Sequence, residues 1–198
     1  LGRVLAGLAP QEPEVHGLLA MMELNASRAA ARTNAEGDAV LLLNQDRGRW
    51  DQMAIGRGLA ALDRAERLGH APGPYVLQAG ITATHARART AAETDFSRIA
   101  ELYAQLGAIL KSPVVELNRA VAVSMAQGPA AGLAIADALL HEPALMRYHL
   151  LPAARADFLE KLGRFAEAKT EFERAALLTQ NARQREQLKL RARNCDKS

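Results

Sequence analysis

Apolar residues recur at three- and four-residue spacing along most of the chain, which is the pattern of amphipathic helices. A helix is expected over residues 14–32, with one apolar stripe facing the core: Val15, Leu18, Leu19, Met22 and Ala26. A second stripe runs up to Ser112: Ile99, Leu102, Tyr103, Leu106, Ile109 and Leu110. Residues 49–68 and a segment after Pro74 are also expected to be helical, whereas residues 39–43 suit a short strand or an extended linker. The pattern predicts an all-α protein with about nine or ten helices.

Residues 112–180 read as two consecutive helical hairpins, with turns at Gly128-Pro129 and at Gly163. The two glycines are 35 residues apart, close to the period of about 34 residues in tetratricopeptide repeats (TPRs), whose helix pairs stack on one another. We therefore expect TPR-like hairpins stacked in a superhelical bundle. The N-terminal helices are assigned to residues 1–111, and the hairpins with a basic C-terminal helix to residues 112–198. Both parts are expected to form one continuous domain.

The local chemistry agrees with these turns. Ser112 is expected to cap the first hairpin with its side chain, and Pro113 suits the first position of a helix. In the second hairpin, apolar and small residues stand where a TPR places its turn aromatic and its close-packing positions: Phe165, Ala168, Phe172 and Ala175.

The octet from Leu43 to Trp50 is the most distinctive local sequence. Asp46 is expected to cap the helix that follows, Arg47 to pair with a carboxylate, and Trp50 to anchor the helix against its neighbours. We interpret the octet as a structural cap and anchor. A site that contacts a ligand or partner through Asp46, Arg47 and Trp50 is the alternative.

Composition narrows the classes of function. The single cysteine, Cys195, excludes an internal disulfide and agrees with a reducing cytoplasm, and no apolar run approaches the length of a membrane span. We therefore expect a cytoplasmic protein without membrane contact. The net charge of +3 is too small to indicate nucleic-acid binding, and the basic residues after Gln180 lack interleaved aromatic side chains, so we interpret them as a solvated terminal helix rather than a nucleic-acid arm.

Signatures of catalysis are missing from the sequence. The five histidines show no metal-ligand spacing, and there is no phosphate-binding loop, dinucleotide fingerprint or nucleophile elbow. We therefore predict neither an enzyme nor a bound cofactor or metal. A small-molecule sensor would need an apolar cavity with convergent polar groups, which a sequence does not reveal.

Binding of a peptide through the hairpins is a more natural use of such a scaffold than catalysis. The positions that line the groove of a TPR correspond here to Val115, Asn118, Ala122 and Met125, and then to Leu150, Ala153, Asp157 and Glu160. Asn118 and Arg119 are polar within an apolar run and could bond an extended peptide. The alternative is that these two side chains satisfy a neighbouring loop of the same chain.

Several motifs together carry a resemblance to a known family. They are Glu12-Pro13-Glu14-Val15, Gln45-Asp46-Arg47 with Trp50, Gly73-Pro74-Tyr75, Ser112-Pro113-Val114-Val115 with Leu117-Asn118-Arg119-Ala120, Gly128-Pro129-Ala130-Ala131-Gly132-Leu133, and Tyr148-His149-Leu150-Leu151. Over nearly its whole length the chain resembles the TPR-like C-terminal extension of one group of extracytoplasmic-function (ECF) bacterial sigma factors.

The resemblance implies a regulatory region of a transcription initiation factor. In that family the promoter elements are read by two N-terminal sigma modules, which this sequence lacks, so contact with DNA is expected only through them. The implied partners are those modules in the same polypeptide and core RNA polymerase. Because the chain opens within an apolar helical segment, we expect it to be a fragment. A free-standing TPR-like scaffold that binds a peptide is the alternative, and the upstream reading frame would distinguish the two.

Overall fold

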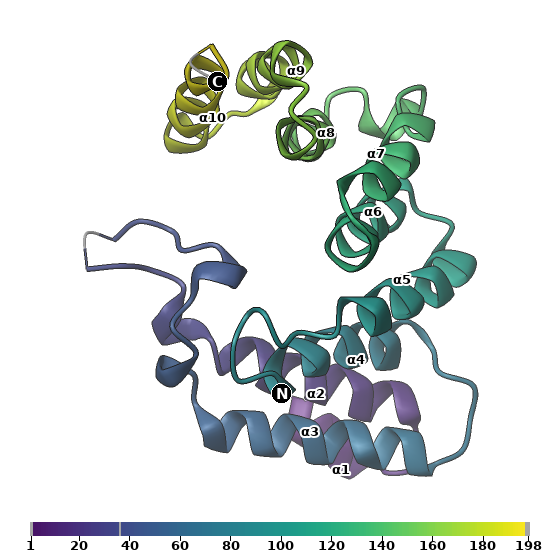
Figure 1. Ribbon diagram of the computed structural model, residues 1–198. Helices are drawn as coiled ribbons and strands as arrows, with labels where there is room; N and C mark the ends of the chain where they lie inside the picture. Colours follow the sequence, from purple (N-terminus) through teal and green to yellow (C-terminus); the bar gives the residue numbers. More distant parts are fainter. Residues whose placement is uncertain (1, 36, 197–198) are drawn as a thin grey trace. The chain divides into compact units, whose positions relative to one another are not determined.

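The computed structural model of the chain describes residues 2–35 and 37–196. This part is helical, and its one bridge between extended residues joins Thr33 and Ala39 (Figure 1). The predicted all-α class and number of helices are confirmed. The ten α-helices are α1 (Gly2–Leu8), α2 (Pro13–Ala26), α3 (Gln52–Arg67), α4 (Pro74–Arg87), α5 (Phe96–Leu110), α6 (Pro113–Gln127), α7 (Pro129–Ala138), α8 (Leu150–Lys161), α9 (Phe165–Leu178) and α10 (Ala182–Asn194).

The chain divides into two compact units, Leu1–Leu110 and Lys111–Ser198, here called unit 1 and unit 2. Unit 1 contains α1 to α5, and unit 2 contains α6 to α10. Each unit has its own cluster of buried apolar residues, so each is described by itself.

Helix α2 lies at the centre of unit 1 and packs against both α3 and α4. Small residues make this close packing possible. A Cβ on Gly17 would lie 2.6 Å from the backbone nitrogen of Val76, and one on Gly58 would lie 2.6 Å from Cγ of Leu24. Side chains from these helices and from the loop before α3 fill the core: Ala20, Leu24, Trp50, Ile55, Leu62 and Val76.

The apolar stripe predicted for the first long helix was wrong in part: Leu19 packs against the core, but the stripe does not form the fully buried face. Helix α2 ends at Ala26 rather than at Arg32, and a separate 3-10 turn follows at Ala29–Ala31. The fully buried residues of α2 are different ones: Pro13, His16, Gly17, Ala20 and Leu24. Met22 is 42% exposed and Ala26 is also exposed. The face with small residues is the one that two neighbouring helices can approach closely.

The segment between α2 and α3 is a linker with short 3-10 turns at Leu42–Asn44 and Arg47–Arg49, so residues 39–43 form a linker and not a strand. Asn34 stabilises a turn before this linker, because its side chain accepts a hydrogen bond from the backbone of Asp38 at 2.7 Å. Residue 36 lies outside the described residues.

Two helical hairpins, α6–α7 and α8–α9, form most of unit 2, and the five helices follow one another along the chain, each packed on the next (Figure 1). Gly128 and Gly163 have φ angles of 99° and 74°, a backbone region that favours glycine, so the two turns occur where they were predicted. Ala168, Phe172 and Ala175 are fully buried, as predicted for core positions of the second hairpin. Ser112 precedes α6, but its side chain makes no capping bond, so that prediction was wrong.

Candidate functional site

The octet before α3 is a structural element of unit 1. Trp50 is 3% exposed and belongs to the core, so its predicted role as an anchor is confirmed. The predicted cap was misplaced. Asp46 accepts a hydrogen bond from the backbone of Gly48 and caps only the 3-10 turn, whereas Asp51 caps α3 by accepting from the backbone nitrogens of Met53 and Ala54. The four residues between Asp46 and Asp51 form the turn that buries Trp50.

Arg47 bonds to carbonyl groups, and the prediction that it pairs with a carboxylate was wrong. Its Nη1 donates to the backbone oxygens of His85 at 2.5 Å and of Ala88 at 2.8 Å, and its Nη2 donates to Oγ1 of Thr94 at 3.0 Å. The guanidinium also lies 4.9 Å from the centre of the Trp50 ring, within the range of a cation–π contact. Arg47 therefore links the octet to the end of α4 and to the loop after it.

The two ends of α4 are satisfied from distant parts of the chain. At its start, the carboxylate of Glu14 accepts hydrogen bonds from the backbone nitrogens of Tyr75 at 2.8 Å and Val76 at 3.1 Å. At its end, Arg47 donates to the carbonyl of His85. A carboxylate at the start of a helix and a cation at its end both suit the helix dipole and the unpaired backbone groups there. Glu14 and Arg47 belong to motifs that carry the family resemblance, and both have this structural role.

His85, near the end of α4, lies close to Arg47 and Arg28. Burial, together with the nearby guanidiniums of Arg47 and Arg28, lowers the pKa of His85 to about 4. Its ring packs edge-on against Phe96, with ring centres 5.8 Å apart, and its Nδ1 has no hydrogen-bond partner among the described residues. The imidazole is therefore neutral at physiological pH, and a proton added to it would be buried beside two cations.

Asn118 and Arg119 are consecutive residues of α6 but differ in their contacts. Asn118 is exposed, and within residues 2–35 and 37–196 its side chain makes no hydrogen bond. Arg119 forms a two-fold hydrogen bond to Glu116 of the same helix, at 2.9 and 2.6 Å. Val121 and Met125, on the same side of α6 as Asn118, are 42% and 41% exposed. We call Asn118, Val121 and Met125 the α6 face.

Asp157 is engaged within unit 2. It accepts one hydrogen bond from Nη2 of Arg191 of α10 at 2.9 Å and lies 2.7 Å from Nζ of Lys161, and Arg191 also bonds to Glu160. Burial alone would raise the pKa of Asp157, but the hydrogen bonds from Lys161 and Arg191 outweigh it and lower the pKa. The guanidinium of Arg191 lies 4.4 Å from the centre of the Phe172 ring. Helix α10 is thus docked on the second hairpin through Arg191.

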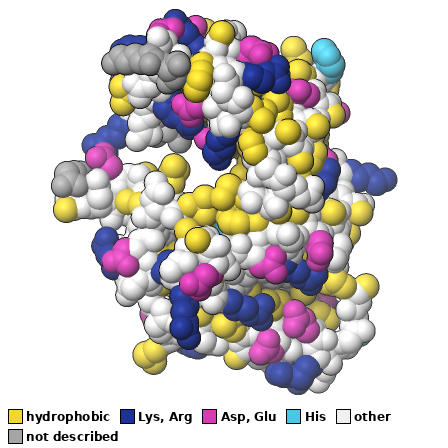
Figure 2. Space-filling model, viewed as in Figure 1, with side chains coloured by type: hydrophobic (Ala, Val, Ile, Leu, Met, Phe, Trp, Pro, Cys, Tyr) yellow, Lys and Arg dark blue, Asp and Glu magenta, His cyan; other side chains and the backbone are white. Residues whose placement is uncertain are grey.

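Other features of the described residues bear on the classes of site. No group of three or more His, Cys, Asp or Glu side chains among them could hold a metal ion. None of the helices in residues 2–35 and 37–196 combines the length and apolar character needed to cross a membrane. On the face that Figure 2 shows, Lys and Arg side chains are interspersed with Asp and Glu instead of gathering in one basic patch.

Comparison with known proteins gives two matches. Residues 1–66 match a family described as a family of unknown function (DUF6596). An uncharacterized protein of Rhizobium meliloti (strain 1021) is 46% identical over 182 residues, which cover 92% of this chain and 42% of that protein. The chain therefore spans about two fifths of the length of this relative. No solved structure matches.

Proposed function

We propose that this chain is a regulatory region of an ECF-type RNA polymerase sigma factor, which modulates transcription initiation by contacting the sigma modules of the same polypeptide. The motifs of the resemblance are spread over both units, from Glu12 to Leu151. The relative from Rhizobium meliloti is a longer protein, with more than half of its length outside the match, which leaves room for further domains there. Its printed name gives no function, so the proposal depends on the motifs and on the surface described next.

The observation that carries the proposal is the α6 face. Two large apolar side chains there, Val121 and Met125, are about two-fifths exposed and follow at helical spacing an asparagine that has no partner within the described residues. An exposed amide next to apolar side chains can bond a partner backbone while the apolar groups are buried, which is how helical scaffolds bind other proteins. TPR-like stacking of the hairpins, if adopted by unit 2, would turn this helix toward the groove. Core RNA polymerase is the second partner in this proposal, reached together with the sigma modules.

The test is calorimetric binding of the chain to the separately expressed sigma modules encoded upstream in the same gene. A variant with Asn118→Ala and Met125→Ala removes both ends of the α6 face without touching the core. Leu177→Ala is the matched control, because Leu177 is 87% exposed in the same unit and lies on α9. We expect the double variant to weaken binding at least tenfold, or about 1.4 kcal/mol, and the control to leave it unchanged.

Two results would count against the proposal. Absence of saturable binding would remove the sigma modules as the partner and favour the free-standing peptide-binding scaffold. Equal weakening in the double variant and in Leu177→Ala would show that binding does not use the α6 face. Arg119→Ala adds a further comparison, since Arg119 is paired with Glu116 and is expected to contribute less than Asn118.

A further inference from the structure

Unit 1 contains a cleft of about 240 Å³ between α3, α4 and α5. Its apolar lining consists of largely buried side chains, each at most 6% exposed to solvent: Leu62, Ala65, Val76, Leu77 and Leu102. Gly80 also lines it, and a Cβ there would lie 3.3 Å from Cδ1 of Leu102, so α4 and α5 meet closely at this wall. The volume lies just below the range of about 300–1,000 Å³ for pockets that take drug-sized ligands. The cleft therefore suits a smaller molecule.

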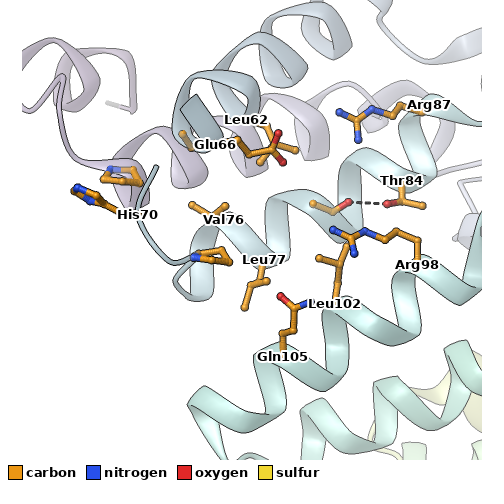
Figure 3. Close-up of a pocket in the computed structure, with 14 residues that line it drawn as sticks. Leu62, Glu66, His70, Val76, Leu77, Thr84, Arg87, Arg98, Leu102 and Gln105 are labelled. Atoms are coloured by element: carbon orange, nitrogen blue, oxygen red, sulfur yellow. Dashed lines mark hydrogen bonds between the residues drawn. The ribbon is translucent and has the colours of Figure 1, made fainter. Parts of the chain in front are cut away.

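Two arginines from different helices stand at the rim of the cleft. Figure 3 shows Arg87 of α4 and Arg98 of α5 reaching toward the space that the apolar side chains line. A second hollow, of about 310 Å³, is lined by Thr84, Arg87 and Arg98 together with Ala88 and the acidic residues Glu93 and Asp95 of the α4–α5 loop. The guanidiniums of Arg87 and Arg98 therefore border both the cleft and the second hollow, so a bound group can reach them.

The present ion pairs of these arginines are weak. Arg87 lies 3.9 Å from Asp63, and Arg98 lies 3.0 Å from Glu101, with all four side chains at least half exposed. Exposed pairs of this kind contribute little free energy. Both guanidiniums can therefore turn to a ligand at small cost, and a carboxylate is the group that guanidiniums bind with paired hydrogen bonds.

We propose that this cleft binds a small amphipathic carboxylate, with its carboxylate on Arg87 and Arg98 and its apolar chain against Leu62, Val76, Leu77 and Leu102. The Glu66 carboxylate also lines the cleft and disfavours a ligand with a second negative charge. Such a ligand would contact α3, α4 and α5 at once. Because it binds only folded unit 1, it would stabilise that unit by mass action. This inference is independent of the partner proposed above, since the whole cleft belongs to unit 1.

The test is titration calorimetry of the full chain with octanoate, with octan-1-ol as the uncharged probe of the same chain length. The double variant Arg87→Gln with Arg98→Gln removes the anion-binding groups. The matched control is Arg49→Gln with Arg67→Gln, which removes the same charge from exposed positions of unit 1 outside the cleft. Thr84→Leu keeps both arginines and fills the hollows that Thr84 lines. Circular dichroism confirms that each variant is folded.

We expect saturable octanoate binding that weakens at least tenfold in the Arg87/Arg98 variant and in Thr84→Leu, and changes less than twofold in the control. Octan-1-ol is expected to bind at least tenfold more weakly than octanoate. The proposal is overturned if octanoate does not bind saturably or if octan-1-ol binds equally well. It is also overturned if the control variant loses as much affinity as the Arg87/Arg98 variant, because binding would then follow net charge and not the cleft.

Discussion

The partly buried imidazole of His85, whose Nδ1 is inaccessible to solvent, predicts a loss of stability in unit 1 on mild acidification. Its pKa is about 4 in the folded chain, against about 6.5 for an unperturbed histidine. Because the folded-state pKa is lowered, the unfolded chain binds the proton more readily. Stability is fully present above the unfolded pKa and falls as the pH drops from there toward the folded pKa.

The magnitude follows from proton linkage. At about pH 5 almost every unfolded chain carries the proton at His85 but only about one tenth of folded chains do, which is a roughly 30-fold difference in the folding equilibrium, or about 2 kcal/mol. Carboxylates contribute at lower pH. The hydrogen bond from Arg57 lowers the pKa of Glu23 below its usual value of 4.5, so its effect appears only when the pH falls further.

Trp50 provides the measurement, because it is the only tryptophan of the chain and lies in the core of unit 1. Urea unfolding followed by its fluorescence is expected to show the loss of about 2 kcal/mol between about pH 7 and about pH 5. The variant His85→Gln should remove most of this slope, whatever its stability at neutral pH. His70→Gln is the matched control, since His70 is exposed in the same unit, and it should keep the slope. A flat wild-type profile, or an unchanged slope in His85→Gln, would refute the account of His85.

Two further predictions concern caps and helix contacts. Asp51→Ala is expected to destabilise unit 1 by about 1 kcal/mol, the usual value of a helix cap. Asp46→Ala should cost less, because Asp46 caps only a 3-10 turn. Urea unfolding monitored by Trp50 fluorescence compares the two variants, and a larger loss for Asp46→Ala would contradict this assignment. Gly132→Ala would place a Cβ 2.5 Å from Cβ of Ser124 and is expected to cost roughly 1–3 kcal/mol in thermal unfolding followed by circular dichroism, whereas Gly56→Ala, on an open face of α3, should be neutral or stabilising.

The helices and the two hairpin turns could be predicted from the sequence because their signals are local. Gly128 and Gly163 adopt the positive φ angles that the turns require, and Phe172 has the spacing of a core residue. The core face of α2 could not be predicted in this way. Hydropathy favours the stripe with the larger apolar residues, yet α2 lies between two helices whose close approach selects small ones, such as Gly17 and Ala20.

The candidate site was less predictable because its contacts join residues far apart in the chain. Nothing local to Glu14 indicates that it accepts from the backbone of Tyr75, 61 residues later, and nothing local to Arg47 indicates the carbonyls of α4. Two aspartates, Asp46 and Asp51, precede α3, and the residue type of either suits a helix cap. Asp51 is the cap because the turn that buries Trp50 lies between Asp46 and the start of the helix. The cleft gave no signal, because Arg87 and Arg98 resemble any exposed arginine on a helix.

The docking of α10 restricts where a partner can bind to unit 2. The terminal helix was expected to be solvated, but Arg191 joins it to Asp157, Glu160 and the ring of Phe172. A partner that used the groove positions of α8 would have to break these contacts. The half-buried carboxylate of Asp157 would then lose one of the hydrogen bonds that lower its pKa. The α6 face carries no such cost, because its asparagine is already exposed and its apolar side chains gain by burial. For this reason we assign the proposed contact with the sigma modules to α6 and not to the second hairpin.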